Sequence, residues 1–328
     1  MKILVTGCAG FIGSNLSEHL LNKGHQVVGI DNFNNYYDPK VKHYNIKDFK
    51  DHKQFKLYEV DILESEKIDQ LFASEHIEAV IHLAAYAGVT YSVAHPVENV
   101  RNNVEATTIL LEACKKYKVG TFLFASTSSV YGDNPTPFNE EMRTDFVLAP
   151  YPATKKSCEV LLYTYAQNFD VNVSIFRIFN PLGLRMRPDL ALPMLVKSCE
   201  YGTEFPMYWT WEQAEKTGRD YCYIGHIFEA FEKVLEKPFK YEIFNVGNSS
   251  PETLKNFVET IEKVCGKKAN INIMPNRKGE MLMTFANVEK ARKLLGYNPS
   301  TTMEQMVKKY YDWFVQQEEW YRLYGTTK

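Results

Sequence analysis

The sequence predicts an α/β fold built on a doubly wound parallel sheet, with a smaller α/β substrate-binding lobe toward the C-terminus. The first half of the 328-residue chain alternates short apolar runs with amphipathic segments, the pattern of parallel strands joined by crossover helices. The first apolar run leads into a glycine turn, Gly7 to Gly13, directly before a helical pattern. Strand, glycine turn and helix in this order are typical of a dinucleotide site. Together these observations favour a Rossmann-type sheet.

Each predicted strand is a short run rich in Val, Ile, Leu or Phe. We expect strands at residues 2–6, 26–30, 56–60, 79–83, 121–126 and 173–177. Amphipathic patterns between them predict helices at 11–23, 65–75, 98–117 and 153–168. Gly24 is expected to end the first helix, because a glycine often follows the last helical residue.

The periodic pattern weakens after the sixth predicted strand, where four residues are expected to interrupt the chain: Pro181, Gly183, Pro188 and Pro193. Later segments comprise an aromatic run at 208–211, a strand at 242–246 and helices at 252–265, 288–295 and 303–316. We assign residues 1–176 to the dinucleotide-binding domain and expect a strand at 242–247 to return to it. Residues 177–328 are assigned mainly to the substrate-binding lobe.

Charge and cysteine content exclude several kinds of partner and site. The 38 basic and 40 acidic residues are scattered along the chain, so no surface for nucleic acid or anionic lipid is indicated. The 6 cysteines are far apart without a C-x-x-C pair, which predicts free buried thiols and no metal site. The apolar run at 3–5 is too short for a signal peptide, and no run approaches a membrane span. We therefore expect a soluble cytoplasmic protein.

The glycine turn is the predicted site for the pyrophosphate of a dinucleotide. Gly7, Gly10 and Gly13 let the backbone approach closely, and the helix beginning at Phe11-Ile12 directs N–H groups at the phosphates. Asp31 ends the second strand, where its carboxylate accepts hydrogen bonds from ribose hydroxyls and repels a 2′-phosphate. The predicted cofactor is therefore NAD rather than NADP. The alternative interpretation is that Asp31 is only a turn residue with no contact to a cofactor.

Residues after the third and fourth strands extend this prediction. Asp61, followed by Ile62, is placed to meet the adenine edge. The run Leu83-Ala84-Ala85 ends the fourth strand with small residues that leave room for the cofactor. His82, just before it, is interpreted as structural.

Tyr151 and Lys155 are the predicted catalytic pair. They are four residues apart at the start of a helix, so their side chains share one face. A phenol with a pKa of about 10 must lose roughly three units to act as a base near neutrality, which is about 4 kcal/mol. A lysine about 4 Å away supplies roughly that amount at an effective dielectric constant near 20. The pair predicts a lysine-assisted tyrosine base for a sugar-like alcohol, and Lys155 is also placed to bind the nicotinamide ribose.

Thr127, Ser128 and Ser129 follow the fifth strand, at the carboxyl edge where open parallel sheets bind ligands. Their hydroxyls are candidates to hold a substrate alcohol or carboxylate. The alternative is ordinary capping, because such clusters are common after strands.

A set of motifs spread over nearly the whole chain resembles one family. The motifs are Val5 to Gly13, Asp31-Asn32, His82 to Ala85, Ser126 to Gly132, Tyr151 with Lys155, Arg177 to Pro181, Arg187 to Asp189, Arg219-Asp220, Asn245 to Asn248, Arg277 to Glu280 and Leu295 to Tyr297. They resemble the extended short-chain dehydrogenase/reductase family, in particular the nucleotide-sugar 4-epimerases and above all the UDP-glucuronate 4-epimerases.

The resemblance implies NAD-dependent epimerisation at carbon 4 of a UDP-sugar, with UDP-glucuronate converted to UDP-galacturonate. Tyr151, helped by Thr127, would take the 4-hydroxyl proton while hydride passes to NAD. The 4-keto sugar would then turn and take the hydride back on its opposite face. A homodimer formed through the helices at 98–117 and 153–168 is also implied, although apolar stripes on these helices are equally consistent with packing on the sheet.

The resemblance also implies binding residues. Asp31 and Asn32 would bind NAD. Asn180, Arg219 and Arg277 would contact the nucleotide diphosphate, and Glu280 the uridine ribose; arginine suits phosphate because its fork donates two parallel hydrogen bonds. Arg187, with Arg185 as a second candidate, would lie near a sugar carboxylate.

Several positions depart from the family pattern and leave alternatives. Asn180 and Thr90 stand where many glucuronate enzymes carry threonine and arginine, so UDP-glucose and UDP-N-acetylglucosamine are alternative substrates. Gly225-His226 replaces an acidic pair that is common in the family. The segment 208–218 is longer and more aromatic than the short turn usual in the family. These departures indicate a reshaped sugar pocket, and the aromatic segment is equally consistent with a packed loop or a subunit contact.

Two other activities are weighed against epimerisation. Related dehydratases and decarboxylases carry an acidic residue where this chain has Ser129, and a serine cannot replace a carboxylate as proton carrier. A lyase is therefore disfavoured. The remaining alternative is a non-catalytic NAD-binding scaffold, which the retained Tyr151 and Lys155 disfavour.

Overall fold

The computed structural model describes residues 1–275 and 282–326, and the chain divides into two compact units. Unit 1 contains Met1–Asn134, Glu140–Ile178 and Phe228–Asn245. Unit 2 contains Pro135–Asn139, Phe179–Ile227 and Val246–Lys328. Each unit is therefore assembled from segments that are separated along the sequence.

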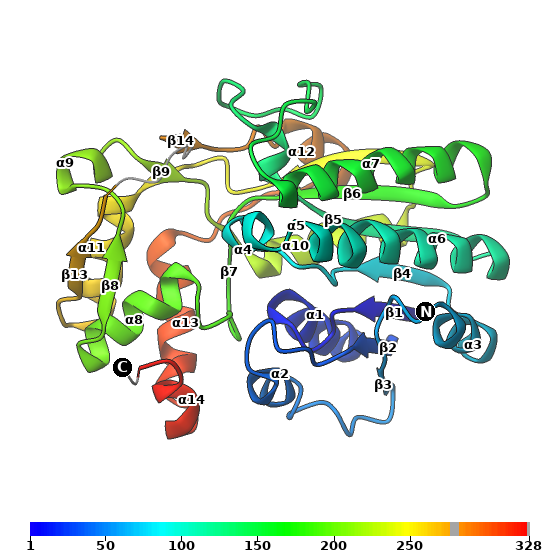
Figure 1. The fold of residues 1–328 in the computed structure, drawn as a ribbon, viewed down its shortest axis with the longest axis horizontal. Coiled ribbons are helices and arrows are strands. Elements are labelled where there is room, and N and C mark those ends of the chain that lie inside the picture. The colour runs from blue at the N-terminus through cyan, green and yellow to red at the C-terminus, as the bar shows by residue number, and fades with distance from the viewer. Residues whose placement is uncertain (276–281, 327–328) are drawn as a thin grey trace. The chain divides into compact units, whose positions relative to one another are not determined.

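Unit 1 is built on a seven-stranded sheet with the order β11-β6-β5-β4-β1-β2-β3 (Figure 1). Its strands are β1 Lys2–Thr6, β2 Gln26–Asp31, β3 Phe55–Glu59, β4 Ala79–His82, β5 Thr121–Thr127, β6 Asn172–Ile178 and β11 Tyr241–Val246. All register pairs between β3 and β6 are parallel. The strand order reverses between β1 and β4, and open parallel sheets bind ligands at such a point. The predicted doubly wound sheet is confirmed.

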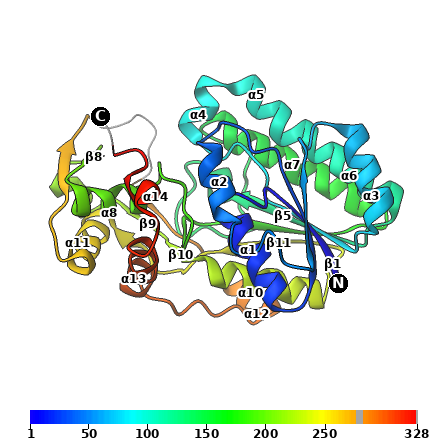
Figure 2. The same ribbon diagram turned by 90° about the horizontal axis from the view of Figure 1, so that it is seen from below.

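The central strands are apolar because helices cover both faces of the sheet. Ile3, Leu4 and Val5 of β1 have no exposed surface. Figure 2 shows α3, α6 and α7 on one face and α1 and α10 on the other. The helical segments of unit 1 are α1 Phe11–Asn22, α2 Pro39–Asn45, α3 Ser65–Glu75, α4 Val89–Ala94, α5 Pro96–Val100, a π-helix at Arg101–Glu105, α6 Ala106–Tyr117, a 3-10 helix at Ser128–Tyr131, α7 Pro150–Asn168 and most of α10 Ile224–Glu236.

Unit 2 contains short strands and packed helices. Its strands are β7 Pro181–Leu182, β8 Glu204–Met207, β9 Gly218–Arg219, β10 Cys222–Tyr223, β12 Glu252–Thr253, β13 Asn270–Ile273 and β14 Met283–Thr284. Its helices are α8 Ala191–Tyr201, α9 Trp211–Ala214, α11 Leu254–Cys265, α12 Glu289–Leu295, α13 Met303–Phe314 and α14 Glu319–Leu323. Helix α11 packs against both α8 and α13, and β8 pairs in parallel with β13.

The structure corrects two expectations about local structure. The helix expected at 98–117 is divided by the π-helix at Arg101–Glu105. Pro193, expected to interrupt the chain, lies in the first turn of α8. A proline is tolerated there because the N–H groups of the first turn have no partner within the helix. Over residues 1–275 and 282–326, the structure has no helix both long and apolar enough to span a membrane.

Candidate active site

The turn between β1 and α1 has a backbone that requires glycine. Gly7 has a φ of +69°, and a Cβ at Gly13 would lie 2.0 Å from the Gly7 carbonyl oxygen. The N–H groups of Gly7 and Cys8 donate to the Ile30 carbonyl at 2.7 and 3.1 Å. The N-cap of α1, Gly10, has no side chain to cap the helix. The first-turn N–H groups of α1 therefore form a cradle suited to an anion.

Asp31, the last residue of β2, is buried and oriented by the backbone around it. Its Oδ2 accepts a hydrogen bond from the Ala9 N–H at 3.2 Å, and its Oδ1 accepts one from Phe33 at 2.9 Å. The Lys42 Nζ lies 3.7 Å from Oδ1 and donates to Asn34 Oδ1 at 2.8 Å. The carboxylate thus lies beside the glycine turn with a buried cation next to it. Sequence reasoning missed Lys42, because no spacing connects it with Asp31.

Asn32 and Asp61, predicted at the ends of different strands, are in contact. The Asn32 amide donates to Asp61 Oδ2 at 2.7 Å, while Asp61 Oδ1 accepts from the Leu63 N–H at 2.9 Å. Ile62, which lies between Asp61 and Leu63 in the sequence, is buried. The structure therefore brings the predicted adenosine-side residues together at one edge of the sheet.

The segment Leu83-Ala84-Ala85 is held by Thr6. The Thr6 hydroxyl accepts hydrogen bonds from the N–H groups of Leu83 and Ala84, at 3.2 and 3.1 Å. It also contacts His82 Nδ1 at 2.7 Å, and His82 Nε2 contacts the Thr107 hydroxyl at 3.0 Å. Burial, and then the charge of Lys155, hold the pKa of His82 well below its usual range. His82 is thus a neutral structural bridge.

Tyr151 and Lys155 both lie on the first turns of α7 and are 8% and 3% exposed. The Tyr151 N–H donates to the Ser92 hydroxyl at 3.0 Å, which anchors the helix start to α4. The Lys155 Nζ donates to the Ala125 carbonyl at 2.9 Å and lies 4.5 Å from the centre of the Phe124 ring. Burial lowers the pKa of Lys155 to about 8, an effect that the nearby Cys158 and Glu159 oppose.

Thr127 ends β5 and has a capping role in this structure. Its hydroxyl accepts a hydrogen bond from the Ser129 N–H at 3.2 Å, at the start of the 3-10 helix. This bond uses one acceptor position of the hydroxyl, which retains a donor and a second lone pair. Ser128 and Ser129 are half-buried. The capping alternative is therefore observed, and it does not exclude a contact with substrate.

A buried ion pair connects β5, β6 and α7. Arg177 Nη2 lies 2.8 Å from Glu159 Oε2, and both side chains are at most 2% exposed. Ser126 donates to Glu159 Oε1 at 2.6 Å. Glu159 is one turn beyond Lys155, so Arg177 fixes α7 to β6, and Ser126 fixes it to β5, the strand that carries Thr127. Glu159 was not predicted from the sequence, because its partner Arg177 lies on a different element, the strand β6.

Two buried asparagines, Asn99 of α5 and Asn103 within the π-helix, hold the start of α7. The Asn103 amide donates to Thr154 Oγ1 at 2.9 Å and to Asn99 Oδ1 at 3.2 Å. Asn103 Oδ1 accepts from the Tyr86 N–H at 3.0 Å. π-helical turns are frequent at functional sites. The only sequence signal was the i,i+4 spacing of Asn99 and Asn103 within an apolar helical pattern.

The substrate candidates of unit 2 have local partners of their own. Asn180 donates to the Asp220 carbonyl at 3.0 Å. Arg219 Nη1 donates to the carbonyls of Gly218 and Leu282, at 2.8 and 3.3 Å. Arg187 forms a bidentate pair with Asp189 through Nε and Nη2, both at 3.0 Å. Arg277 and Glu280 lie outside the described residues.

The unusual segments of unit 2 have structural roles. His226 Nε2 contacts the Thr301 hydroxyl at 2.8 Å, which anchors the start of α10 to the segment before α13. A capping box formed by Thr210 and Gln213 starts α9, with Trp209 buried and Trp211 39% exposed. Gly225-His226 therefore serves packing, and the aromatic segment is partly a packed loop.

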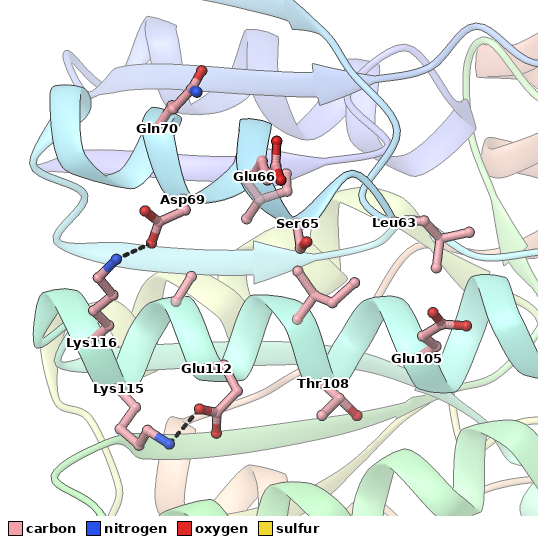
Figure 3. Close-up of a pocket in the computed structure, with 13 residues that line it drawn as sticks. Leu63, Ser65, Glu66, Asp69, Gln70, Glu105, Thr108, Glu112, Lys115 and Lys116 are labelled. Atoms are coloured by element: carbon pink, nitrogen blue, oxygen red, sulfur yellow. Dashed lines mark hydrogen bonds and ion pairs between the residues drawn. The ribbon is translucent and has the colours of Figure 1, made fainter.

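A surface groove between α3 and α6 contains none of the predicted site residues (Figure 3). It is lined by charged side chains, and Lys116 pairs with Asp69 across it at 2.6 Å. Lys115 pairs with Glu112 on α6 itself. Because both of its lysines are already paired with carboxylates, the groove does not resemble a nucleotide site. In residues 1–275 and 282–326, no three His, Cys, Asp or Glu side chains are grouped as metal ligands.

Comparisons with known proteins identify the family of this chain. The family described as GDP-mannose 4,6 dehydratase matches residues 4–310. A UDP-glucuronate 4-epimerase of Thermodesulfobacterium geofontis is 36% identical over 94% of this chain and 95% of its own length.

Solved structures are similar over nearly the whole chain. The UDP-glucuronic acid 4-epimerase of Bacillus cereus, crystallised with UDP-glucuronic acid and NAD, has a TM-score of 0.89 and 34% identity, covering 96% of this chain and 99% of that one. A UDP-glucose 4-epimerase of Thermotoga maritima has a TM-score of 0.86 and 28% identity, with coverage of 96% and 99%. The chain belongs to the nucleotide-sugar epimerase and dehydratase family of extended short-chain dehydrogenase/reductases.

Proposed function

We propose that this protein is an NAD-dependent UDP-glucuronate 4-epimerase, an isomerase that interconverts UDP-glucuronate and UDP-galacturonate. The observation that carries the proposal is the placement of Tyr151 and buried Lys155 on the first turns of α7, with the Lys155 Nζ bonded to the Ala125 carbonyl of β5, the strand that ends at Thr127. The glycine cradle and Asp31 lie on the same unit and fit NAD. The relatives named for this activity cover 94% and 96% of this chain.

The residues of unit 1 have distinct proposed roles. Tyr151 takes the proton of the 4-hydroxyl and later returns it to the same oxygen. Lys155 in its cationic form stabilises the phenolate, and Thr127 holds the substrate oxygen. Bound NAD supplies the hydride acceptor and donor. Leu83, Ala84 and Ala85 leave room beside the glycine turn for it.

The absence of a carboxyl group at Ser129 favours epimerisation over elimination. Dehydration and decarboxylation need further acid–base help beside a keto sugar. Ser129 is half-buried and its N–H bonds to Thr127. Its hydroxyl cannot supply a proton at neutral pH as a carboxylic acid does. A lyase therefore remains only the second candidate, suggested by the dehydratase members of the family.

Unit 2 is proposed to bind the nucleotide sugar. Arg219, Arg277 and Asn180 would contact the diphosphate, and Glu280 the uridine ribose. Arg187 is the proposed contact of the sugar carboxylate. Because Asp189 is 63% exposed at its side chain while Arg187 is only 16% exposed, a substrate carboxylate would replace an exposed partner of a largely buried guanidinium.

A substrate panel tests the proposed function. Purified protein is incubated separately with UDP-glucuronate, UDP-glucose and UDP-N-acetylglucosamine, and the products are separated by chromatography. We expect UDP-galacturonate from UDP-glucuronate without accumulation of NADH. Turnover of only UDP-glucose or UDP-N-acetylglucosamine would instead assign the protein as the 4-epimerase of that sugar. Release of carbon dioxide or water would indicate a lyase. Tight NAD binding without any turnover would indicate a non-catalytic scaffold.

We also propose a homodimer and a cytoplasmic location. Helices α4 and α5 pack beside α7, and the side chains they expose include Val93, Val97 and Val100, with Val160 and Tyr163 on α7. An exposed apolar strip of this kind is typical of a subunit contact, and a second copy of the same helices would cover it. The 6 free cysteines agree with a reducing compartment.

A further inference from the structure

Three half-buried tyrosine rings meet at the carboxyl edge of the sheet in unit 1. Tyr36 follows β2, Tyr86 follows β4, and Tyr91 lies on α4. The centre of the Tyr36 ring is 5.2 Å from that of Tyr86 and 4.8 Å from that of Tyr91, and the centres of Tyr86 and Tyr91 are 5.3 Å apart. Favourable aromatic pairs have separations of roughly 4.5–7 Å. The segments after β2 and β4 are therefore joined by ring contacts.

The tyrosine contact spans the carboxyl end of β1, because β1 lies between β2 and β4 in the sheet. The glycine turn begins at this end of β1. The Gly7 N–H donates to the Ile30 carbonyl of β2 at 2.7 Å, and a Cβ at Gly7 would lie 3.0 Å from the Ala84 backbone. The segments that carry the tyrosines thus leave the sheet on either side of the cradle for the pyrophosphate.

The β4 side of this contact is fixed to the helices behind it. The Tyr86 N–H donates to Asn103 Oδ1 at 3.0 Å, and the Tyr86 carbonyl accepts from the Asn99 amide at 3.0 Å. Both asparagines are buried. The Tyr91 hydroxyl donates to Glu98 Oε2 at 2.9 Å. Tyr86 and Tyr91 are therefore held by α5 and the π-helix.

The β2 side has bonds of shorter range. The Tyr36 N–H donates to Asn34 Oδ1 at 3.2 Å, and the Asn34 N–H donates to Asn32 Oδ1 at 3.2 Å. Such bonds set the shape of the loop. The loop reaches the β4 side through the ring contacts and through the Asn34 amide, which donates to the Tyr86 hydroxyl at 3.5 Å. We therefore expect the loop after β2 to move when the rings separate.

We propose that Tyr36, Tyr86 and Tyr91 form a clasp that retains NAD at the glycine turn. A dinucleotide bound there leaves only after Tyr36 separates from the two rings on the β4 side, so the ring contacts slow its release. Retention suits a reaction that returns the hydride to the sugar in every cycle, because the cofactor need not be exchanged. The clasp rests on NAD as the cofactor of the proposed epimerase and not on the identity of the sugar.

Exchange of the resident NAD tests the clasp. Purified full-length protein is mixed with excess radiolabelled NAD, and the bound label is counted on filters over time, because its uptake is limited by release of the resident cofactor. We expect Tyr36→Ala to exchange NAD about tenfold faster than wild type, since it loses two aromatic contacts. Tyr36→Phe keeps the ring and should exchange slowly. Equal exchange rates for wild type and Tyr36→Ala would overturn the proposal.

The matched control is Tyr201→Ala, the same change at a position on α8 of unit 2 that is 37% exposed. It should exchange NAD at the wild-type rate. Circular dichroism shows that each variant is folded before exchange is measured. An increase in Tyr201→Ala as large as that in Tyr36→Ala would contradict a specific role for the clasp.

Gly88 provides a second test that leaves all three rings in place. A Cβ at Gly88 would lie 2.5 Å from the Tyr36 hydroxyl oxygen and 3.2 Å from Tyr91 Cβ. Gly88→Ala should therefore displace Tyr36 and speed NAD exchange. In the double variant Gly88→Ala with Tyr36→Phe, the oxygen that the new methyl group would meet is absent, so most of the slow exchange should return. Equally fast exchange in the single and double variants would contradict control of release by the Tyr36 contact.

The exchange measurement is separate from the test of the proposed activity. A wild type that exchanges NAD more slowly than Tyr36→Ala and converts no UDP-sugar would support the clasp and contradict the epimerase. Epimerisation by a wild type that exchanges NAD as fast as Tyr36→Ala would support the epimerase and contradict the clasp.

Discussion

At the scale of single residues, the candidate site depends on a buried lysine next to a tyrosine. Lys155 has one backbone acceptor, the Ala125 carbonyl, and an aromatic ring beside it. Its positive charge is costly in that environment, which is why its pKa falls to about 8. In the proposed mechanism this charge stabilises the Tyr151 phenolate, so the same burial that costs stability strengthens the proposed base.

The proposed base is tested by Tyr151→Phe. Removing a general base costs about 10²- to 10⁴-fold in rate, so we expect kcat for epimerisation to fall by about 10³-fold with NAD still bound. Turnover is measured by product chromatography, and bound NAD by absorbance after denaturation. Tyr201→Phe is the matched control, because Tyr201 lies on α8 of unit 2 with 37% of its surface exposed. Near wild-type turnover in Tyr151→Phe would exclude Tyr151 as the base.

The depressed pKa of Lys155 predicts a pH dependence of stability. Folded Lys155 has a pKa of about 8, whereas an unfolded lysine has one near 10.4. Between these values the unfolded state binds more protons, so the free energy of unfolding rises with pH. The full difference corresponds to about 3 kcal/mol. At neutral pH both states are protonated, and the burial penalty is fully present.

The comparison with Lys155→Met isolates this effect, because the variant has no titrating group at the position. We expect wild type to gain up to about 3 kcal/mol relative to the variant between pH 8 and 10.5, measured by urea denaturation at each pH. The variant should also lose most epimerase activity. A constant difference across this window would show that Lys155 has an ordinary pKa.

At the scale of secondary-structure elements, buried polar contacts connect α7 to its neighbours. Glu159 joins α7 to β6 through Arg177 and to β5 through Ser126. Asn103 joins the π-helix to α7 through Thr154. These contacts fix the helix that carries the proposed base relative to the strand that carries Thr127.

The Glu159 contact is tested by Glu159→Gln. The change removes one partner of a buried ion pair and leaves the Arg177 charge uncompensated, which typically costs about 3–5 kcal/mol. We expect a loss of that size in the free energy of unfolding, measured by urea denaturation. Lys156→Ala is the matched control, because Lys156 Nζ also lies 3.6 Å from Glu159 Oε2 but its side chain is 28% exposed. Its cost should stay below about 1 kcal/mol. Equal costs for the two variants would refute the role of the buried pair.

Element boundaries show where sequence patterns are informative. The glycine turn, β2 ending at Asp31 and the helix from Met303 follow from local periodicity and punctuation, and the structure confirms them. The π-helix was not predicted; Asn99 and Asn103 next to and within it bond to Tyr86 and Thr154, contacts with other segments that no local pattern reveals. Helix α8 was missed because Pro193 was read as a breaker rather than as a first-turn residue.

At the scale of the whole molecule, the proposed dimer is open to a direct test. Val97 is 73% exposed and Val160 is 54% exposed, so a charge at both positions should be tolerated in a monomer and should repel a second copy. We expect wild type to sediment as a dimer and the double variant Val97→Glu with Val160→Glu as a folded monomer. Leu323→Glu, an exposed apolar position on α14, should remain dimeric. A monomeric wild type would refute the proposal.

The sequence by itself determined the fold class, the glycine cradle and the pairing of Tyr151 with Lys155, because each depends on residues within a few positions of one another. Only the tertiary structure decided that Lys42 lies beside Asp31 and that Glu159 binds Arg177. Such contacts join residues on different elements. Their partners are set by how the strands and helices pack, and no local periodicity encodes that packing.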